Sequence, residues 1–177
     1  MKKIILIILG FLVIVILSNK NMVEEIVIPN ESIRIRVIAN SNSIEDQNLK
    51  KKVKKSIQYE MGKLLKDAKT IDEVRSILND NLVDVKYTVE KVLTEQNKSD
   101  LNFDVNFGKN YFPQKVYKGV SYNEGYYESI VIKLGESKGD NWWCVLFPPL
   151  CLLDESEEDI SNVEYKSFVK EIIDKYF

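Results

Sequence analysis

The chain has 177 residues, a formal net charge of −2 and no histidine. This charge balance argues against a nucleic-acid-binding protein, because neutralising phosphates requires concentrated positive charge. The lack of histidine removes the usual general base of serine and cysteine hydrolases and the commonest zinc ligand, so we expect neither a metal nor a cofactor.

The N-terminus has the pattern of an export signal. Lys2 and Lys3 precede a run at 4–17 that is apolar except for Gly10. As a helix this run would span roughly 21 Å, less than the roughly 30 Å hydrocarbon core, which favours a cleaved signal peptide. Residues 17–19 lack the small-x-small pattern of a cleavage site, so an uncleaved anchor is the alternative. In both alternatives the positively charged end stays on the cytoplasmic side and the bulk of the chain is exported to the other side of the membrane.

Residues 33–40 alternate in polarity and predict a half-buried strand. Arg34 and Arg36 lie on its polar side. They are interpreted either as ordinary solvated charges or as two guanidinium groups that bind the carboxylates of a partner, each through a pair of N–H donors.

Polar residues at 40–43 end this strand, because their side chains compete for backbone hydrogen bonds. Ser43 is the predicted N-cap of a helix. Asn40, Ser41 and Asp46 lie at this junction, where we interpret them as a cap that satisfies the turn amides. Ligand contact is the alternative, because loops often carry function.

Two amphipathic helices follow. Apolar residues recur at spacings of three and four over 49–68 and again over 74–92. Thr70 and Glu73 form a capping box at the start of the second helix. The five lysines at 50–55 are interpreted as a solvated helix face, with contact to anionic lipid as a minor alternative.

Alternating patterns predict four more strands, at 101–107, 116–120, 126–134 and 142–147. The expected fold class is therefore α+β. It consists of a mostly antiparallel sheet of about five strands with two helices packed on one face, plus a C-terminal helix and the N-terminal apolar leader.

The segment 141–151 carries both tryptophans of the chain and a Pro-Pro pair. Apolar residues alternate with apolar residues here, so a strand would have two dry faces. A helix of this chain or another protein must therefore cover the second face. Pro148 and Pro149 end the strand because they cannot donate ladder hydrogen bonds.

The only cysteines, Cys144 and Cys151, are seven residues apart. Outside the membrane a disulfide is one interpretation, and it would stabilise the fold by roughly 2–3 kcal/mol. Two small buried apolar residues are the other.

Past Cys151, five acids within 154–159 are typical of a solvated linker. Apolar residues at helical spacing then predict a terminal helix that covers the open sheet face or binds something else. The predicted parts are a signal peptide or membrane anchor, a tether, an α+β domain, and an acidic linker with the terminal helix, at 1–19, 20–30, 31–153 and 154–177.

Two stretches resemble the signatures of the stage II sporulation protein R family. The first is Ile-Arg-Ile-Arg-Val-Ile-Ala-Asn-Ser at 33–41, continued by 45–47 and the lysine-rich helix, and the second is 135–151. The resemblance covers roughly 28–154. The chain departs from it at three positions, where the family often has an acid, a proline and a basic residue: Asn42, Ile44 and Asp140.

The resemblance implies a developmental signal of endospore-forming bacteria that is made in the forespore. It would be exported into the space between forespore and mother cell, and an uncleaved leader would keep it membrane-associated. There it would activate a membrane-embedded aspartic protease of the mother cell, which removes the pro-sequence of sigma-E.

Such a protein is expected to act by binding and not as an enzyme, and the resemblance implies no catalytic residue. The alternatives are a structural protein of the septum envelope and an envelope hydrolase that uses Glu45 and Asp46. The candidate partner-binding residues are Arg34, Arg36, Asn40, Ser41, Asp46, Trp142, Trp143, Pro148 and Pro149.

Overall fold

The computed structural model describes residues 26–152 and 161–177. The predictions for the leader, for most of the tether and for the acidic stretch lie outside the described residues. Within the described ranges, no helix is long and apolar enough to cross a bilayer. The elements run in the order β1 (Ile26–Val27), β2 (Ile33–Ile38), α2 (Ile44–Leu64), α3 (Ile71–Asp80), α4 (Leu82–Glu95), β3 (Phe103–Phe112), β4 (Lys115–Tyr117), β5 (Val120–Tyr122), β6 (Gly125–Leu134), β7 (Asn141–Phe147), η1 (Leu150–Leu152) and α5 (Asn162–Tyr176).

The α+β class is confirmed, but the expected mostly antiparallel sheet of about five strands is wrong. The described residues form two mixed sheets, one of four strands in the order β3-β6-β2-β7 and one of three in the order β1-β5-β4. β2 runs parallel to β6 and antiparallel to β7. Alternating polarity is the same in parallel and antiparallel strands, so the pattern could not distinguish them. The parallel pair needs a long crossover, which α2–α4 and the intervening strands supply.

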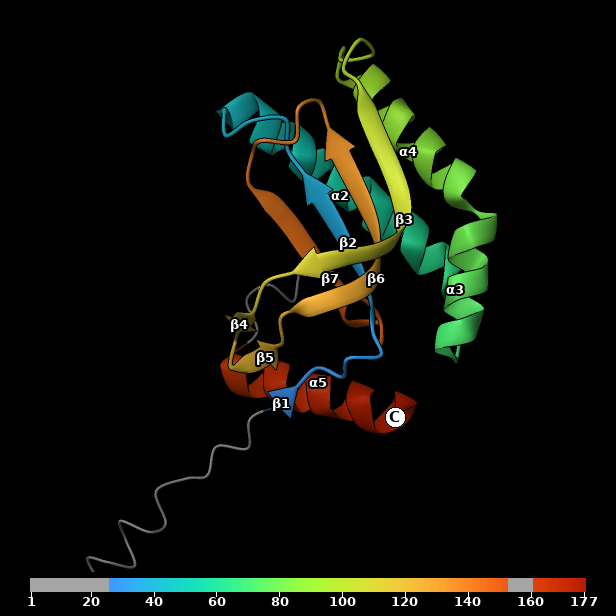
Figure 1. Cartoon of the computed structure of the whole chain (residues 1–177), viewed down its shortest axis with the longest axis vertical. Helices are drawn as coiled ribbons and strands as arrows, with labels where there is room; N and C mark the ends of the chain where they lie inside the picture. The colour runs from blue at the N-terminus through green and yellow to red at the C-terminus, as the bar shows by residue number, and fades with distance from the viewer. Residues whose placement is uncertain (1–25, 153–160) are drawn as a thin grey trace, which may run out of the picture.

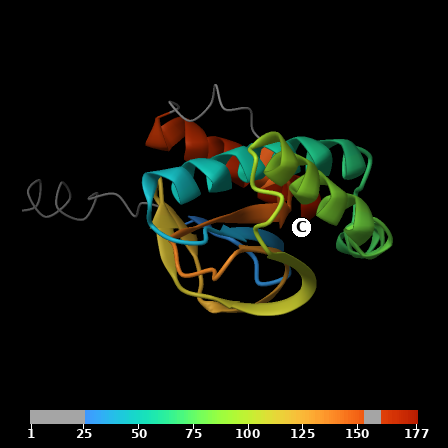
Figure 2. The same cartoon turned by 90° about the horizontal axis from the view of Figure 1, so that it is seen from above.

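Three helices cover one face of the main sheet, and Figure 2 shows them as a layer above the strands. Ser43 is the N-cap of α2, with its side chain accepting the N–H of Asp46 at 3.1 Å, and Thr70 and Glu73 form the capping box of α3. Both predicted helix starts are therefore confirmed. The expected second helix, however, is divided into α3 and α4 at Asn81.

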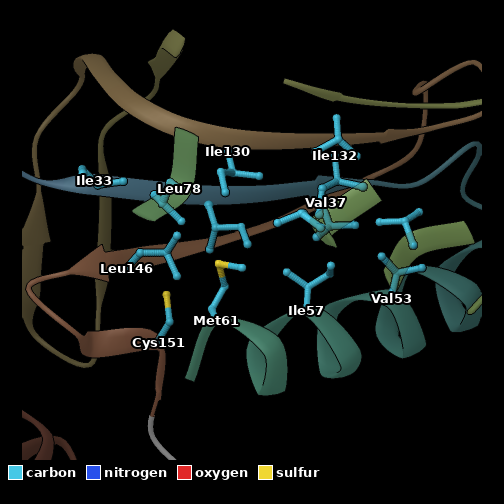
Figure 3. Packing of buried hydrophobic residues seen from close by; sticks show 14 of the residues in the cluster. Ile33, Val37, Val53, Ile57, Met61, Leu78, Ile130, Ile132, Leu146 and Cys151 are labelled. Carbon is cyan, nitrogen blue, oxygen red and sulfur yellow. The ribbon is translucent and has the colours of Figure 1, made fainter. Parts of the chain in front are cut away.

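The main core lies between α2 and the sheet. In Figure 3, Ile57 and Met61 of α2 point at Ile130 and Ile132 of β6, and all four side chains are completely buried. Leu146 of β7 joins the same cluster. Burying each such side chain stabilises the fold by about 1.5–3 kcal/mol, so this contact fixes the helices on the sheet.

The terminal helix α5 covers part of the other side of the molecule. Tyr165 and Val169 of α5 are buried in a second cluster with Val120 and Val145. The Tyr165 hydroxyl lies 2.7 Å from the hydroxyl of Tyr122 on β5. In Figure 1, α5 lies beside β1, β4 and β5 at the lower end of the molecule. The chain thus covers the second dry face of β7 in part with its own helix.

The structure joins Cys144 to Cys151 in a disulfide, with 5.6 Å between their Cα atoms. Cys151 is buried in the main core, and its carbonyl accepts a hydrogen bond of 2.9 Å from Gln58 of α2. The Phe147–Pro148 peptide between the cysteines is cis. The disulfide therefore ties the middle of β7 to the turn that packs on α2.

Replacing both Cys144 and Cys151 with alanine is expected to lower the free energy of unfolding by about 2–3 kcal/mol, because the short loop no longer restricts the unfolded chain. Urea unfolding of the purified protein measures the loss, and reduced wild-type protein should show a similar one. An intact mass that does not change on reduction, together with unchanged unfolding of the double variant, would refute the disulfide.

Candidate functional site

The two stretches that carry the family resemblance lie side by side. β2 pairs with β7 along its length, so that Ile35 lies opposite Cys144 and Arg36 opposite Trp143. The loops that follow β2 and precede β7 also meet. Two segments that are far apart in the sequence thus form one continuous structural unit.

Four hydrogen bonds join these two loops, and we call this set the loop interlock. The carbonyls of Ala39 and Asn40 accept the N–H groups of Gly139 and Lys138 at 3.0 and 3.1 Å. The side-chain oxygens of Asn40 and Asn42 accept the N–H groups of Glu136 and Asp140 at 2.9 and 2.6 Å.

Two glycines make this close approach of the loops feasible. A Cβ atom at Gly135 would collide with the Asn40 side chain, and its φ of +55° is itself unfavourable for other residues. A Cβ atom at Gly139 would collide with the carbonyl of Ser41. The glycines of the second signature are therefore explained by packing.

Asp46 links the interlock to the start of α2. Its carboxylate accepts hydrogen bonds from the Ser41 hydroxyl at 2.5 Å and from the Asn40 amide at 2.9 Å. The bond from Ser41, with smaller contributions from Asn40 and Ser43, lowers the pKa of Asp46. The neighbouring Glu45 forms a salt bridge of 2.7 Å with Lys98. Asn40, Ser41 and Asp46 thus serve the turn that connects β2 to α2.

An open cavity of about 410 Å³ adjoins the interlock. Asn40, Lys98 and Glu136 are among its lining residues. All three make hydrogen bonds or salt bridges to protein groups, so the cavity presents side chains that are already engaged.

The first arginine of β2 is not solvated. Arg34 is 0% exposed, which corrects the interpretation of this side chain as an ordinary solvated charge. Its guanidinium carbon lies 3.4 Å from the centre of the Tyr127 ring, 5.0 Å from that of Trp143 and 5.1 Å from that of Phe112. On the face of β2 that was expected to be polar, three aromatic rings therefore enclose the Arg34 guanidinium, and we call this enclosure the aromatic chamber.

Two more cations lie on the same rings. The Arg36 guanidinium is 3.9 Å from the centre of the Phe112 ring, and its Nη2 donates to the Tyr111 carbonyl at 2.8 Å. The ammonium of Lys115, on β4, is 5.1 Å from the centre of the Trp143 ring. We call Arg34, Arg36, Lys115 and the rings of Phe112, Tyr127 and Trp143 the cation–aromatic cluster.

Sequence analysis missed Lys115, Phe112 and Tyr127 as members of this cluster. β3 bends at mid-length, and its second half leads to β4 beside the lower half of the main sheet (Figure 1). Phe112 and Lys115 reach the face of Arg34 through this bend. No local pattern in the sequence signals it, apart from Gly108 in the middle of β3.

The described residues supply no carboxylate partner for the charges of the cluster. Within residues 26–152 and 161–177, neither arginine nor Lys115 forms a salt bridge, and Nε of both arginines and Nη1 of Arg34 make no hydrogen bond. Burial lowers the pKa of Arg34 to about 10 and also lowers the pKa values of Arg36 and Lys115. Cation–π contacts of about 0.5–2 kcal/mol each offset part of this desolvation.

The remaining candidates from β7 do not form one surface. Trp142 packs toward the helices, with the Lys54 ammonium 5.2 Å from its ring centre, whereas Trp143 belongs to the cluster on the opposite face. Pro148 is buried and Pro149 is half-buried at the end of the strand. The structure thus brings together Arg34, Arg36 and Trp143 and separates them from Trp142 and the interlock.

The described residues contain no group of three histidine, cysteine, aspartate or glutamate side chains that could hold a metal ion.

Comparison with known proteins gives the family. The family described as stage II sporulation protein R matches residues 29–157. The chain belongs to this family. It is also 38% identical to the stage II sporulation protein R of Bacillus subtilis (strain 168) over 159 residues, which is 89% of this chain and 70% of the relative. No solved structure matches the chain.

Membership of the stage II sporulation protein R family supports a role in sporulation. The matched range contains β2, the loop interlock, the cation–aromatic cluster and β7. It ends before α5, so the helix that packs with Val145 in the second cluster lies outside the matched residues.

Replacing Asp46 with asparagine is expected to lower the free energy of unfolding at neutral pH by about 1 kcal/mol, because its hydrogen bonds to Ser41 and Asn40 lose their charge. The folded pKa of Asp46 lies below its unfolded value, so these bonds stabilise the fold above about pH 4 and are lost as the pH falls further. The variant should therefore lose less stability on acidification. Asp67→Asn, at an exposed carboxylate, is the control, and parallel pH profiles of wild type and Asp46→Asn would contradict the interpretation.

Replacing Arg34 with methionine is expected to leave the free energy of unfolding unchanged or to raise it by about 1 kcal/mol, since an apolar side chain suits the chamber and needs no desolvation of charge. Arg34→Ala should instead lose about 2–4 kcal/mol, because it leaves a cavity among the rings. Urea unfolding measures both. Equal losses in the two variants would show that the guanidinium itself holds the fold together.

Proposed function

We propose that the chain is an exported sporulation signal that activates a membrane-embedded aspartic protease of the mother cell. Activation leads to proteolytic maturation of the pro-sigma-E factor. The family match over residues 29–157 is the observation that carries this proposal. The 38% identity to the Bacillus subtilis relative across 89% of this chain supports it.

The sequence of the N-terminus supports export. Lys2 and Lys3 followed by the apolar run at 4–17 are typical of a secretory leader or a single anchor. Either would deliver the folded part of the chain to the space between forespore and mother cell. There it would meet the extracytoplasmic side of a protease embedded in the mother-cell membrane.

The proposed mode of action is binding. A ligand shifts a protease toward its active state only to the extent that it binds this state more tightly, and each tenfold preference is worth about 1.4 kcal/mol. Interfaces gain most of their energy from a few arginine and aromatic side chains. The cation–aromatic cluster offers both types together on one face of β2 and β7.

The cluster is a better candidate for the contact than the loop interlock. Asn40, Ser41 and Asp46 are engaged in hydrogen bonds that hold the loops together. Arg36 is half-buried and Lys115 is exposed, so a partner can reach both. We therefore assign the protease contact to the part of the cluster formed by Arg36, Lys115 and Trp143.

Replacing Arg36 with glutamine is expected to reduce processing of pro-sigma-E by roughly tenfold or more, because a charge-assisted hydrogen bond is worth about 1.5–3 kcal/mol. The measurement is an immunoblot of precursor and mature sigma factor in sporulating cells that express this chain as the only family member. The variant protein must accumulate and fold like the wild type.

Lys86→Gln is the matched control, since it removes one exposed positive charge from α4 on the helix-covered side of the sheet. This variant should process normally. Normal processing by Arg36→Gln would exclude Arg36 from the contact. Absence of processing with the wild-type chain, although it is exported and folded, would refute the signalling function itself.

A further inference from the structure

We propose that the cation–aromatic cluster binds a carboxylate-bearing segment of the partner protein, with Arg36 and Lys115 as the side chains that contact it. This inference rests on the proposed function for the identity of the partner, but its chemistry follows from the cluster alone. Three positive charges surround two adjacent rings, Phe112 and Trp143, whose centres are 5.4 Å apart.

The described residues place no negative charge beside the cluster. An unpaired charge that is removed from water costs free energy, and proteins normally place a carboxylate beside a buried arginine. Here no carboxylate pairs with any of the three cations in the described part of the chain. Arginine–carboxylate pairs do occur elsewhere in the fold: Arg75 forms a salt bridge of 2.6 Å with Glu128 on the helix-covered side of the sheet.

Both arginines of the cluster have N–H donors without a partner among the described residues. Arg34 is completely buried, yet its Nε and Nη1 make no hydrogen bond to the described residues, and its Nη2 donates to the Asn123 carbonyl at 3.4 Å. Arg36 uses Nη2 for the Tyr111 carbonyl, and its Nε is buried without a partner among the described residues. The guanidinium of Arg36 lies over the Phe112 ring, and a planar guanidinium of this kind matches the geometry of a carboxylate.

A partner can reach two of the three cations from solvent. Arg34 lies beneath the surface and contributes positive potential, whereas Arg36 is half-buried and Lys115 is exposed. A carboxylate that binds Arg36 and Lys115 therefore needs no opening of the aromatic chamber. The half-buried Trp143 ring next to Lys115 provides an apolar wall, so a peptide side chain suits the site better than an ion that needs a full shell of polar contacts.

The test is titration of the purified chain with a capped tetraglutamate peptide. The Nε–Hε signals in NMR spectra report on the guanidinium groups of Arg34 and Arg36. We expect a saturable shift of the Arg36 signal with tetraglutamate and none with tetraglutamine. In the double variant Arg36→Gln/Lys115→Gln, calorimetric affinity for the peptide should fall tenfold or more.

Lys86→Gln/Lys91→Gln is the matched control, because it removes the same charge from exposed positions of α4. It should bind tetraglutamate like the wild type. Four results would overturn the proposal: equal binding by the two double variants, an equal shift with tetraglutamine, binding of inorganic phosphate as tight as that of the peptide, or concentration-dependent dimerisation that produces the same shift. A fifth is a shift of the Arg36 signal on neutralising the five acids within 154–159 without added peptide, since the chain itself would then fill the site.

The processing assay in cells separates this proposal from the proposed function. Processing by the wild type and by Arg36→Gln/Lys115→Gln alike, without peptide binding, would refute the docking chemistry and leave the signalling function in place. Peptide binding that depends on Arg36 and Lys115, without any processing by the wild type, would refute the signalling function and leave the binding site in place.

Discussion

The pairing of β2 with β7 is the constraint on which the rest of the structure depends. β2 lies inside the four-stranded sheet, and β7 is its antiparallel neighbour at the edge. One side of this pair carries the core that holds α2, and the other side carries the cation–aromatic cluster. The hydrogen bonds of the loop interlock fix the register of β7 against β2. A register shift of one residue would move every side chain of β7 to the opposite face of the sheet. Core and cluster therefore depend on the same register.

The cluster is an expensive arrangement for a protein of this size. Total stabilities of single domains are about 5–15 kcal/mol, and two desolvated guanidinium groups, for which the described residues supply no carboxylate, reduce that margin. Cation–π contacts recover only part of the cost. A methionine at position 34 would fill the chamber without the charge. Retaining an arginine there is easier to explain by binding than by folding, because local rules are broken most often where a protein functions.

Sequence reasoning found what local chemistry determines. Ser43, Thr70 and Glu73 were recognisable as helix starts, because a cap needs only neighbours in the sequence. The direction of β6 relative to β2 was not recognisable, since it depends on where the chain returns after three helices. The burial of Arg34 was missed for a related reason: its aromatic neighbours come from β3, β6 and β7, and a period of two shows only that the side chain leaves the core face.

The disulfide and the interlock act on the cluster from a distance. Cys144 neighbours Trp143, and the bond to Cys151 holds the middle of β7 against the turn that packs on α2, while the interlock holds the start of β7 beside the start of α2. Trp143 is thus fixed between two anchors, and its ring in turn positions the charges of Arg34 and Lys115. Loosening either anchor would let the ring move and would weaken the cluster without altering any of its residues. The two family signatures therefore act as the frame of a binding surface whose contacts lie partly outside them, at Phe112 and Lys115.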